Sequence, residues 1–152
     1  MELVDGTKEQ RPNPEIIMGA LENAGREDEE ALQKVLLYSL NPNITQVQVN
    51  NTVFMYFAKA KGEGMEALSS VFNLESADGL PNNLLKFLAR MQKRGITAVT
   101  LTTIDPNVFR AFIKAIPYLE QNGTEAGIAQ HKTKNKFIGR VVFGKDKLEV
   151  EL

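Results

Sequence analysis

Residues 76–103, SADGLPNNLLKFLARMQKRGITAVTLTT, contain the clearest indication of the fold of this chain. It predicts a helix over 81–94 that ends at Gly95 and has the apolar face Leu84, Phe87, Leu88 and Met91. Residues 96–103 are small or β-branched, which is typical of a strand covered by other structure. Because another strand is predicted over 65–74, the stretch indicates a βαβ unit.

The segments that precede this unit extend the same sheet. Apolar alternation and β-branched residues predict strands over 44–49 and 53–58, which form an antiparallel meander with the strand over 65–74. Before the meander we expect a short strand over 2–4 and two helices between residues 14 and 40.

The segments that follow complete the prediction. Asp105 and Pro106 are a typical start of a helix, whose expected buried stripe is Val108, Phe109, Phe112, Ile113 and Ile116. A closing hairpin is predicted from strands over 124–132 and 136–143, and 148–150 is a candidate last strand. The fold class is therefore α+β, a mixed sheet of an antiparallel meander and a βαβ unit flanked by about four helices.

Composition limits the functions that this chain can have. Its 152 residues, 43% hydrophobic and 24% charged, are typical of one globular domain over 1–152. The absence of cysteine excludes disulfides and thiolate catalysis. His131 is the single histidine, which excludes a two-histidine phosphoesterase despite the His-x-Thr pattern at 131–133. A net charge of −1 argues against nucleic-acid binding through bulk charge.

The sequence also bears on location. Residues 1–10 are polar and acidic and lack the basic and apolar regions of a signal peptide. No apolar run approaches the roughly 20 residues that span a membrane. We therefore expect a cytoplasmic or intraparticle protein without a membrane partner.

The loop before the helix over 81–94 resembles a phosphate-binding loop. Gly79 precedes the Leu-rich helix, and a helix N-terminus presents unpaired N–H groups and a positive dipole end to an anion. With the order of elements, this loop resembles that of the GNAT superfamily of N-acetyltransferases, whose N–H groups hold the pyrophosphate of acetyl-coenzyme A. The resemblance implies a GNAT-like fold and the cofactor-binding residues Ser76, Gly79, Leu80, Asn82 and Asn83.

Departures from the family pattern concern both cofactor binding and catalysis. Ser76 replaces the family's long Gln or Arg, Pro81 lacks an N–H donor, and Asp78 adds a negative charge beside the anion. Phe112 occupies the position of the tyrosine that protonates the leaving thiolate. By position, the candidates for the general base are Glu66 and Glu75, each of which also suits a solvated strand end.

A basic cluster in the closing hairpin is the candidate partner-binding site. Its members are Lys132, Lys134, Lys136 and Arg140, followed by Lys145 and Lys147. Such a cluster suits an acidic protein, a protein shell or a nucleic-acid backbone. Charges on an edge hairpin also protect a sheet against edge-to-edge aggregation.

Two functions remain open. The first is a non-catalytic interaction or structural module of acetyltransferase-like fold, without a cofactor, that binds a protein partner or self-assembles. By analogy with small viral proteins of this fold, it would be viral or virion-associated. The second is an acetyl-CoA-dependent N-acetyltransferase with a variant loop. The sequence leaves open whether Phe54, Phe57 and Phe72 fill the gap between the fourth and fifth strands, where the family seats its cofactor.

Overall fold

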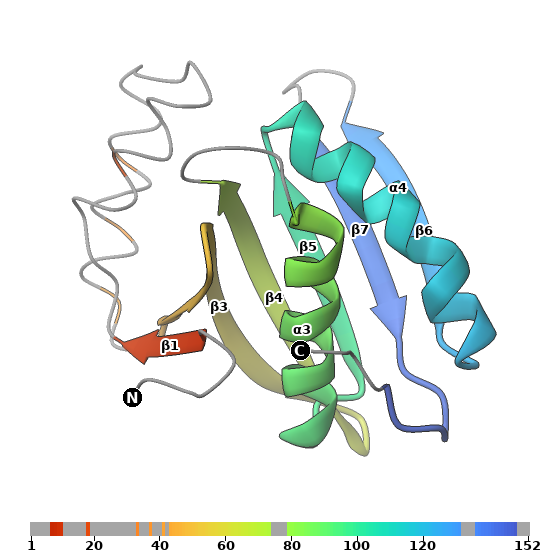
Figure 1. Cartoon of the computed structure of the whole chain (residues 1–152). Helices are drawn as coiled ribbons and strands as arrows, with labels where there is room; N and C mark the ends of the chain where they lie inside the picture. The colour runs from red at the N-terminus through yellow and green to blue at the C-terminus, as the bar shows by residue number, and fades with distance from the viewer. Residues whose placement is uncertain are drawn as a thin grey trace.

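A computed structural model describes residues 7–10, 18, 33, 37, 41, 43–73, 79–131 and 136–148, and for 7–10, 129–131 and 136 it describes the backbone alone. The described chain forms a seven-stranded sheet with two helices, shown in Figure 1. The elements are β1 (Thr7–Gln10), β2 (Thr45–Val49), β3 (Thr52–Lys61), β4 (Gly64–Asn73), α3 (Leu80–Lys93), β5 (Ala98–Thr103), α4 (Pro106–Gln121), β6 (Glu125–His131) and β7 (Lys136–Val142).

The strand order of the sheet is β1-β2-β3-β4-β5-β7-β6. β4 and β5 run parallel and are connected through α3, whereas the other neighbouring pairs of described strands are antiparallel. The predicted meander, βαβ unit, closing hairpin and α+β class are therefore confirmed.

Both described helices cover the same face of the sheet (Figure 1). α3 packs on β2 and β3, and α4 packs on β4, β5, β6 and β7. Phe54 of β3 stacks on Phe87 of α3 with a distance of 4.0 Å between ring centroids, and both rings are fully buried. We call this covered face of the sheet the helix face.

Capping chemistry places the helices close to their predicted bounds. Asp105 caps α4 by accepting a hydrogen bond from the Asn107 N–H at 2.9 Å, as its position before Pro106 predicted. Gly95, just beyond α3, has a φ of +87°, the left-handed conformation that glycine adopts readily.

The buried stripe of α4 was predicted only in part. Ile113 is 41% exposed, whereas Ala111, Ala115 and Leu119 are buried. The reason is that α4 packs against α3 as well as against the sheet, so its buried arc extends toward one flank of the helix.

Other predictions fall at the ends of the chain. The strand over 2–4 lies outside the described residues, as do the two helices between 14 and 40 apart from residues 18, 33 and 37. Leu148 lies in no strand, and 149–150 are outside the described residues. β1 was not predicted, because its sequence TKEQ lacks apolar alternation. No helix in the described part of the chain has the length and apolar character needed to cross a membrane.

Candidate functional site

The N-terminus of α3 retains part of an anion-binding geometry. Gly79 precedes the helix with a φ of +75° and is exposed, and the first helical turn carries no acidic residue. Pro81 contributes no N–H, and the Asn83 N–H donates to the Gly79 carbonyl at 2.9 Å. Among the predicted cofactor ligands, Leu80 and Asn82 therefore keep first-turn N–H groups that the helix itself does not use.

Ser76 and Asp78 lie outside the described residues, as does Glu75, one of the two general-base candidates. The cofactor-binding assignment of Ser76 and the base assignment of Glu75 stay predictions.

The Asn83 side chain has a structural role that the sequence did not reveal. It is buried, and its Nδ2 donates to Asn51 Oδ1 and to Thr52 Oγ1, each at 3.0 Å. Its Oδ1 accepts a hydrogen bond from Asn50 Nδ2 at 2.9 Å. Asn83 thus holds the turn between β2 and β3 against the start of α3.

The gap between β4 and β5 is closed where their ladder ends. The last paired residues are Ser70 and Thr102. One position further, Thr103 Oγ1 donates to the Val71 carbonyl at 3.1 Å and accepts from the Asp105 N–H at 3.1 Å. The hydrogen bond to Val71 therefore connects the two strands one residue beyond the end of the ladder, at the start of the gap in which the resemblance places an acyl cofactor.

Aromatic side chains fill the space over this point on the helix face. Among the described residues, the cavity at this point is about 10 Å³ and is lined by Val71, Leu84, Leu101, Thr103, Val108, Phe109, Phe112, Phe137 and Gly139. Such a volume is at most that of about one water molecule. The rings of Phe109 and Phe137 stack with centroids 4.4 Å apart. A Cβ atom added to Gly139 would lie 2.8 Å from the Phe112 ring, so Phe112 packs directly on that glycine.

The residues that fill the gap differ from those that the sequence suggested. Phe54 lies in the core against Phe87, and Phe57 is 37% exposed beside a groove on the opposite face of the sheet. Phe72 alternates with Val71 along β4, so it also faces away from the helices. Phe112 itself is buried, and as a phenylalanine it has no proton to donate at that position.

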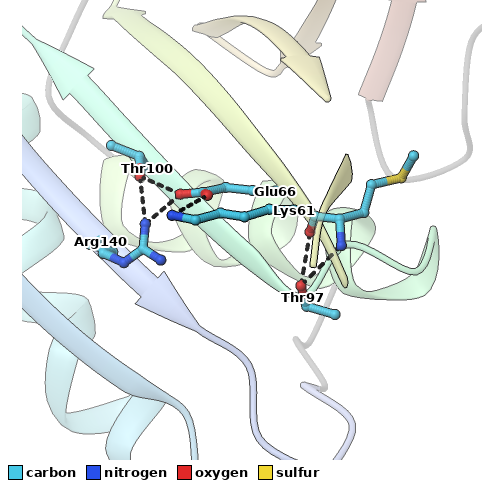
Figure 2. A network of polar contacts seen from close by, with 6 residues as sticks. Lys61, Glu66, Thr97, Thr100 and Arg140 are labelled. Carbon is cyan, nitrogen blue, oxygen red and sulfur yellow. Dashed lines mark hydrogen bonds and ion pairs between the residues drawn. The ribbon is translucent and has the colours of Figure 1, made fainter. Parts of the chain in front are cut away.

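Glu66 lies at the centre of a polar network on the opposite face of the sheet (Figure 2). Its side chain is 7% exposed and accepts hydrogen bonds from Arg140 Nη1 and, at 3.4 Å, from Thr100 Oγ1. Lys61 Nζ lies 3.3 Å from the second carboxylate oxygen.

These contacts determine the protonation of Glu66. The hydrogen bond from Arg140 lowers the pKa of Glu66 below its ordinary value of 4.5, and Lys61 lowers it further, against the raising effect of burial. A carboxylate with a lowered pKa and both oxygens occupied is a poor acceptor for a substrate proton.

The basic cluster is only partly described. Lys132 and Lys134 lie outside the described residues, and Lys136 is described by its backbone in β7. Arg140 points to Glu66 on the face of the sheet away from the helices, as Figure 2 shows. The structure therefore assigns Arg140 a role in the sheet that its place in a cluster of lysines did not indicate.

The described residues contain no group of three or more His, Asp or Glu side chains that could hold a metal ion.

The meander, the parallel β4–α3–β5 unit, α4 and the closing hairpin define a GNAT-like acetyltransferase fold. The aminoglycoside 6'-acetyltransferase type Ii is similar to this chain with a TM-score of 0.56 and 16% identity over 95% of this chain and 99% of its own. A GNAT-family acetyltransferase from Streptococcus pneumoniae has 11% identity, coverages of 91% and 99%, and a TM-score of 0.44. No family model and no curated protein matches the sequence. At such identities the likeness establishes the fold alone.

Proposed function

We propose that this protein is a non-catalytic interaction or structural module built on a GNAT-like fold. The observation that carries this proposal is the closed gap between β4 and β5. Thr103 Oγ1 donates to the Val71 carbonyl, and the cavity that the described aromatic side chains line is about 10 Å³. Small-molecule sites in proteins typically enclose about 300 to 1,000 Å³. An acyl-pantetheine arm therefore does not fit into this cavity among the described residues without displacement of buried side chains.

The chemistry of the surrounding residues supports the same proposal. Acetyl transfer to an amine needs a base that removes a proton and a donor that protonates the leaving thiolate. Phe112 stands where the resemblance places the donor, and the lowered pKa of Glu66 makes it a weak base. Binding of a protein partner, self-assembly and association with a virus particle remain predictions within this proposal.

A second candidate is an acetyl-CoA-dependent N-acetyltransferase with a variant loop. It is favoured by the exposed Gly79 in left-handed conformation and by the acid-free first turn of α3, which suit an anion. In this case the N–H groups of Leu80 and Asn82 would hold the pyrophosphate, and water would replace the missing phenol.

Calorimetric titration with acetyl-coenzyme A separates the two candidates. We expect no saturable heat from the native chain at ligand concentrations up to about 1 mM, because the gap is closed. A dissociation constant above about 1 mM corresponds to a binding free energy smaller than about 4 kcal/mol. A Pro81→Gly variant restores the missing N–H and serves as the matched comparison. Micromolar binding by the native chain, with thiol release when an amine is added, would overturn the proposal. If only the variant binds acetyl-coenzyme A, the loss of cofactor binding in the native chain is due to Pro81.

A further inference from the structure

The outermost strand, β6, has an edge without the usual protection against pairing. β6 is the last strand of the sheet beyond β7. Its sequence EAGIAQH has no proline and no lysine, and its charged or titratable residues are at its two ends. It pairs with β7 residue for residue over its whole length, without a bulge. Natural edge strands are usually blocked by lysine, proline or a bulge, and an unblocked edge is a template for another strand.

Two exposed isoleucines lie beside this edge on the helix face. Ile128 of β6 is 47% exposed and pairs with Gly139, which faces Phe112 of α4. Ile113 of α4 is 41% exposed and follows Phe109 by one turn of the helix. Because Phe109 stacks on Phe137 of β7, this flank of α4 faces the β7–β6 side of the sheet rather than α3. Figure 1 shows α4 lying along β6 and β7 at this side.

We propose that two copies of this chain associate through antiparallel pairing of their β6 strands. With a two-fold axis at Ile128, the middle residue of the strand, Ile128 faces its own copy. Ala126 then lies opposite Gln130 of the second copy, and Glu125 opposite His131 of the second copy. No like charges oppose each other, and the isoleucine pair joins the exposed apolar surfaces of both copies.

This association would continue the sheet of one copy into that of the other. The edge N–H and C=O groups of both strands would find partners, and the exposed Ile113 and Ile128 side chains would be covered by the second copy. The proposal rests on the self-assembly that the proposed function includes and names its interface, but its test is independent of cofactor binding. β7 and β5 separate β6 from β4, so binding of acetyl-coenzyme A neither requires nor prevents the pairing.

Size-exclusion chromatography with light scattering tests the proposal on the full chain. We expect the native protein to approach twice its mass of 16.9 kDa as its concentration rises from about 1 to about 100 µM. Ile128→Lys places two lysines face to face at the two-fold axis and should weaken the dimer at least about tenfold. Met65→Lys is the matched control, because Met65 is 42% exposed on the inner strand β4. It should leave the dimer intact.

Two further variants keep the test decisive if Ile128→Lys alone alters folding. Ile128→Glu should also be monomeric, and a mixture of the Glu and Lys variants should recover the dimer mass. Because the chain has no cysteine, Ile128→Cys should give a disulfide-linked dimer on mild oxidation, and Met65→Cys should not. A native mass of 16.9 kDa at every concentration would overturn the proposal. So would a native dimer that neither Ile128→Lys weakens nor Ile128→Cys crosslinks.

Discussion

Replacement of Asn83 by alanine should destabilise the protein, because this side chain connects α3 to the β2–β3 turn. The variant loses the hydrogen bonds to Asn50, Asn51 and Thr52. Asn50 is exposed and can bond to water, whereas Thr52 is fully buried and loses a donor that water cannot replace. The lost hydrogen bonds to Asn51 and Thr52 cost about 1 kcal/mol each, and the Thr52 hydroxyl, buried without this donor, costs about 1 kcal/mol more. The better helix propensity of alanine offsets part of this loss. The expected loss is about 2 kcal/mol.

Urea unfolding followed by circular dichroism measures this loss. With a denaturant dependence of about 2 kcal/mol per molar, the midpoint should fall by about 1 M. Asn82→Ala is the matched control, since Asn82 is the exposed neighbour in the same helical turn and its replacement should leave the midpoint unchanged or slightly raised. Equal midpoints for the two variants would refute the assignment of Asn83 as the residue that holds the turn.

Two other substitutions test the closed gap and the polar network. Gly139→Ala places a Cβ 2.8 Å from the Phe112 ring in a space of about 10 Å³, so it should cost about 1 to 3 kcal/mol in thermal unfolding. Gly127→Ala, whose Cβ meets nothing within 4 Å, should cost little, and similar losses for both would contradict the packing described for Phe112. Because the pKa of Glu66 is lowered in the folded protein, its contribution to stability is present above pH 4.5 and is lost as the pH falls through the folded pKa. Glu66→Gln should therefore destabilise the protein at pH 7 and make its unfolding free energy less dependent on pH below 4.5; parallel pH profiles for native and variant would count against this account.

The elements of the fold were largely predictable because their signals are local. The start of α4 was visible in Asp105 and Pro106, and the end of α3 in Gly95, since caps depend on residues within one turn. The turn at residues 50–51 was likewise visible between two apolar runs, and Asn50 there adopts a φ of +54°. β1 was missed, because a polar edge strand is recognised by its neighbour β2 and not by its own residues.

The sequence predicted which chemical groups are missing at the candidate site, but it did not predict which residues contact one another there. The absence of a phenol at Phe112 and of an N–H at Pro81 follows from the residues themselves. The bond between Thr103 and Val71 joins residues 32 positions apart, and that between Arg140 and Glu66 joins residues 74 positions apart. No periodicity or spacing rule predicts contacts between residues so far apart in the sequence.

Local sequence predicts the helices and strands of the described chain other than β1, because hydrophobic period, capping and turn chemistry act over a few residues. Which faces meet depends instead on contacts between segments that lie far apart in the sequence. The parallel pairing of β4 with β5 brings Thr103 to Val71, and the packing of α4 over the sheet brings Phe112 against Gly139. The closed gap is therefore a property of strand order and helix packing, which exist only once distant segments have been brought together.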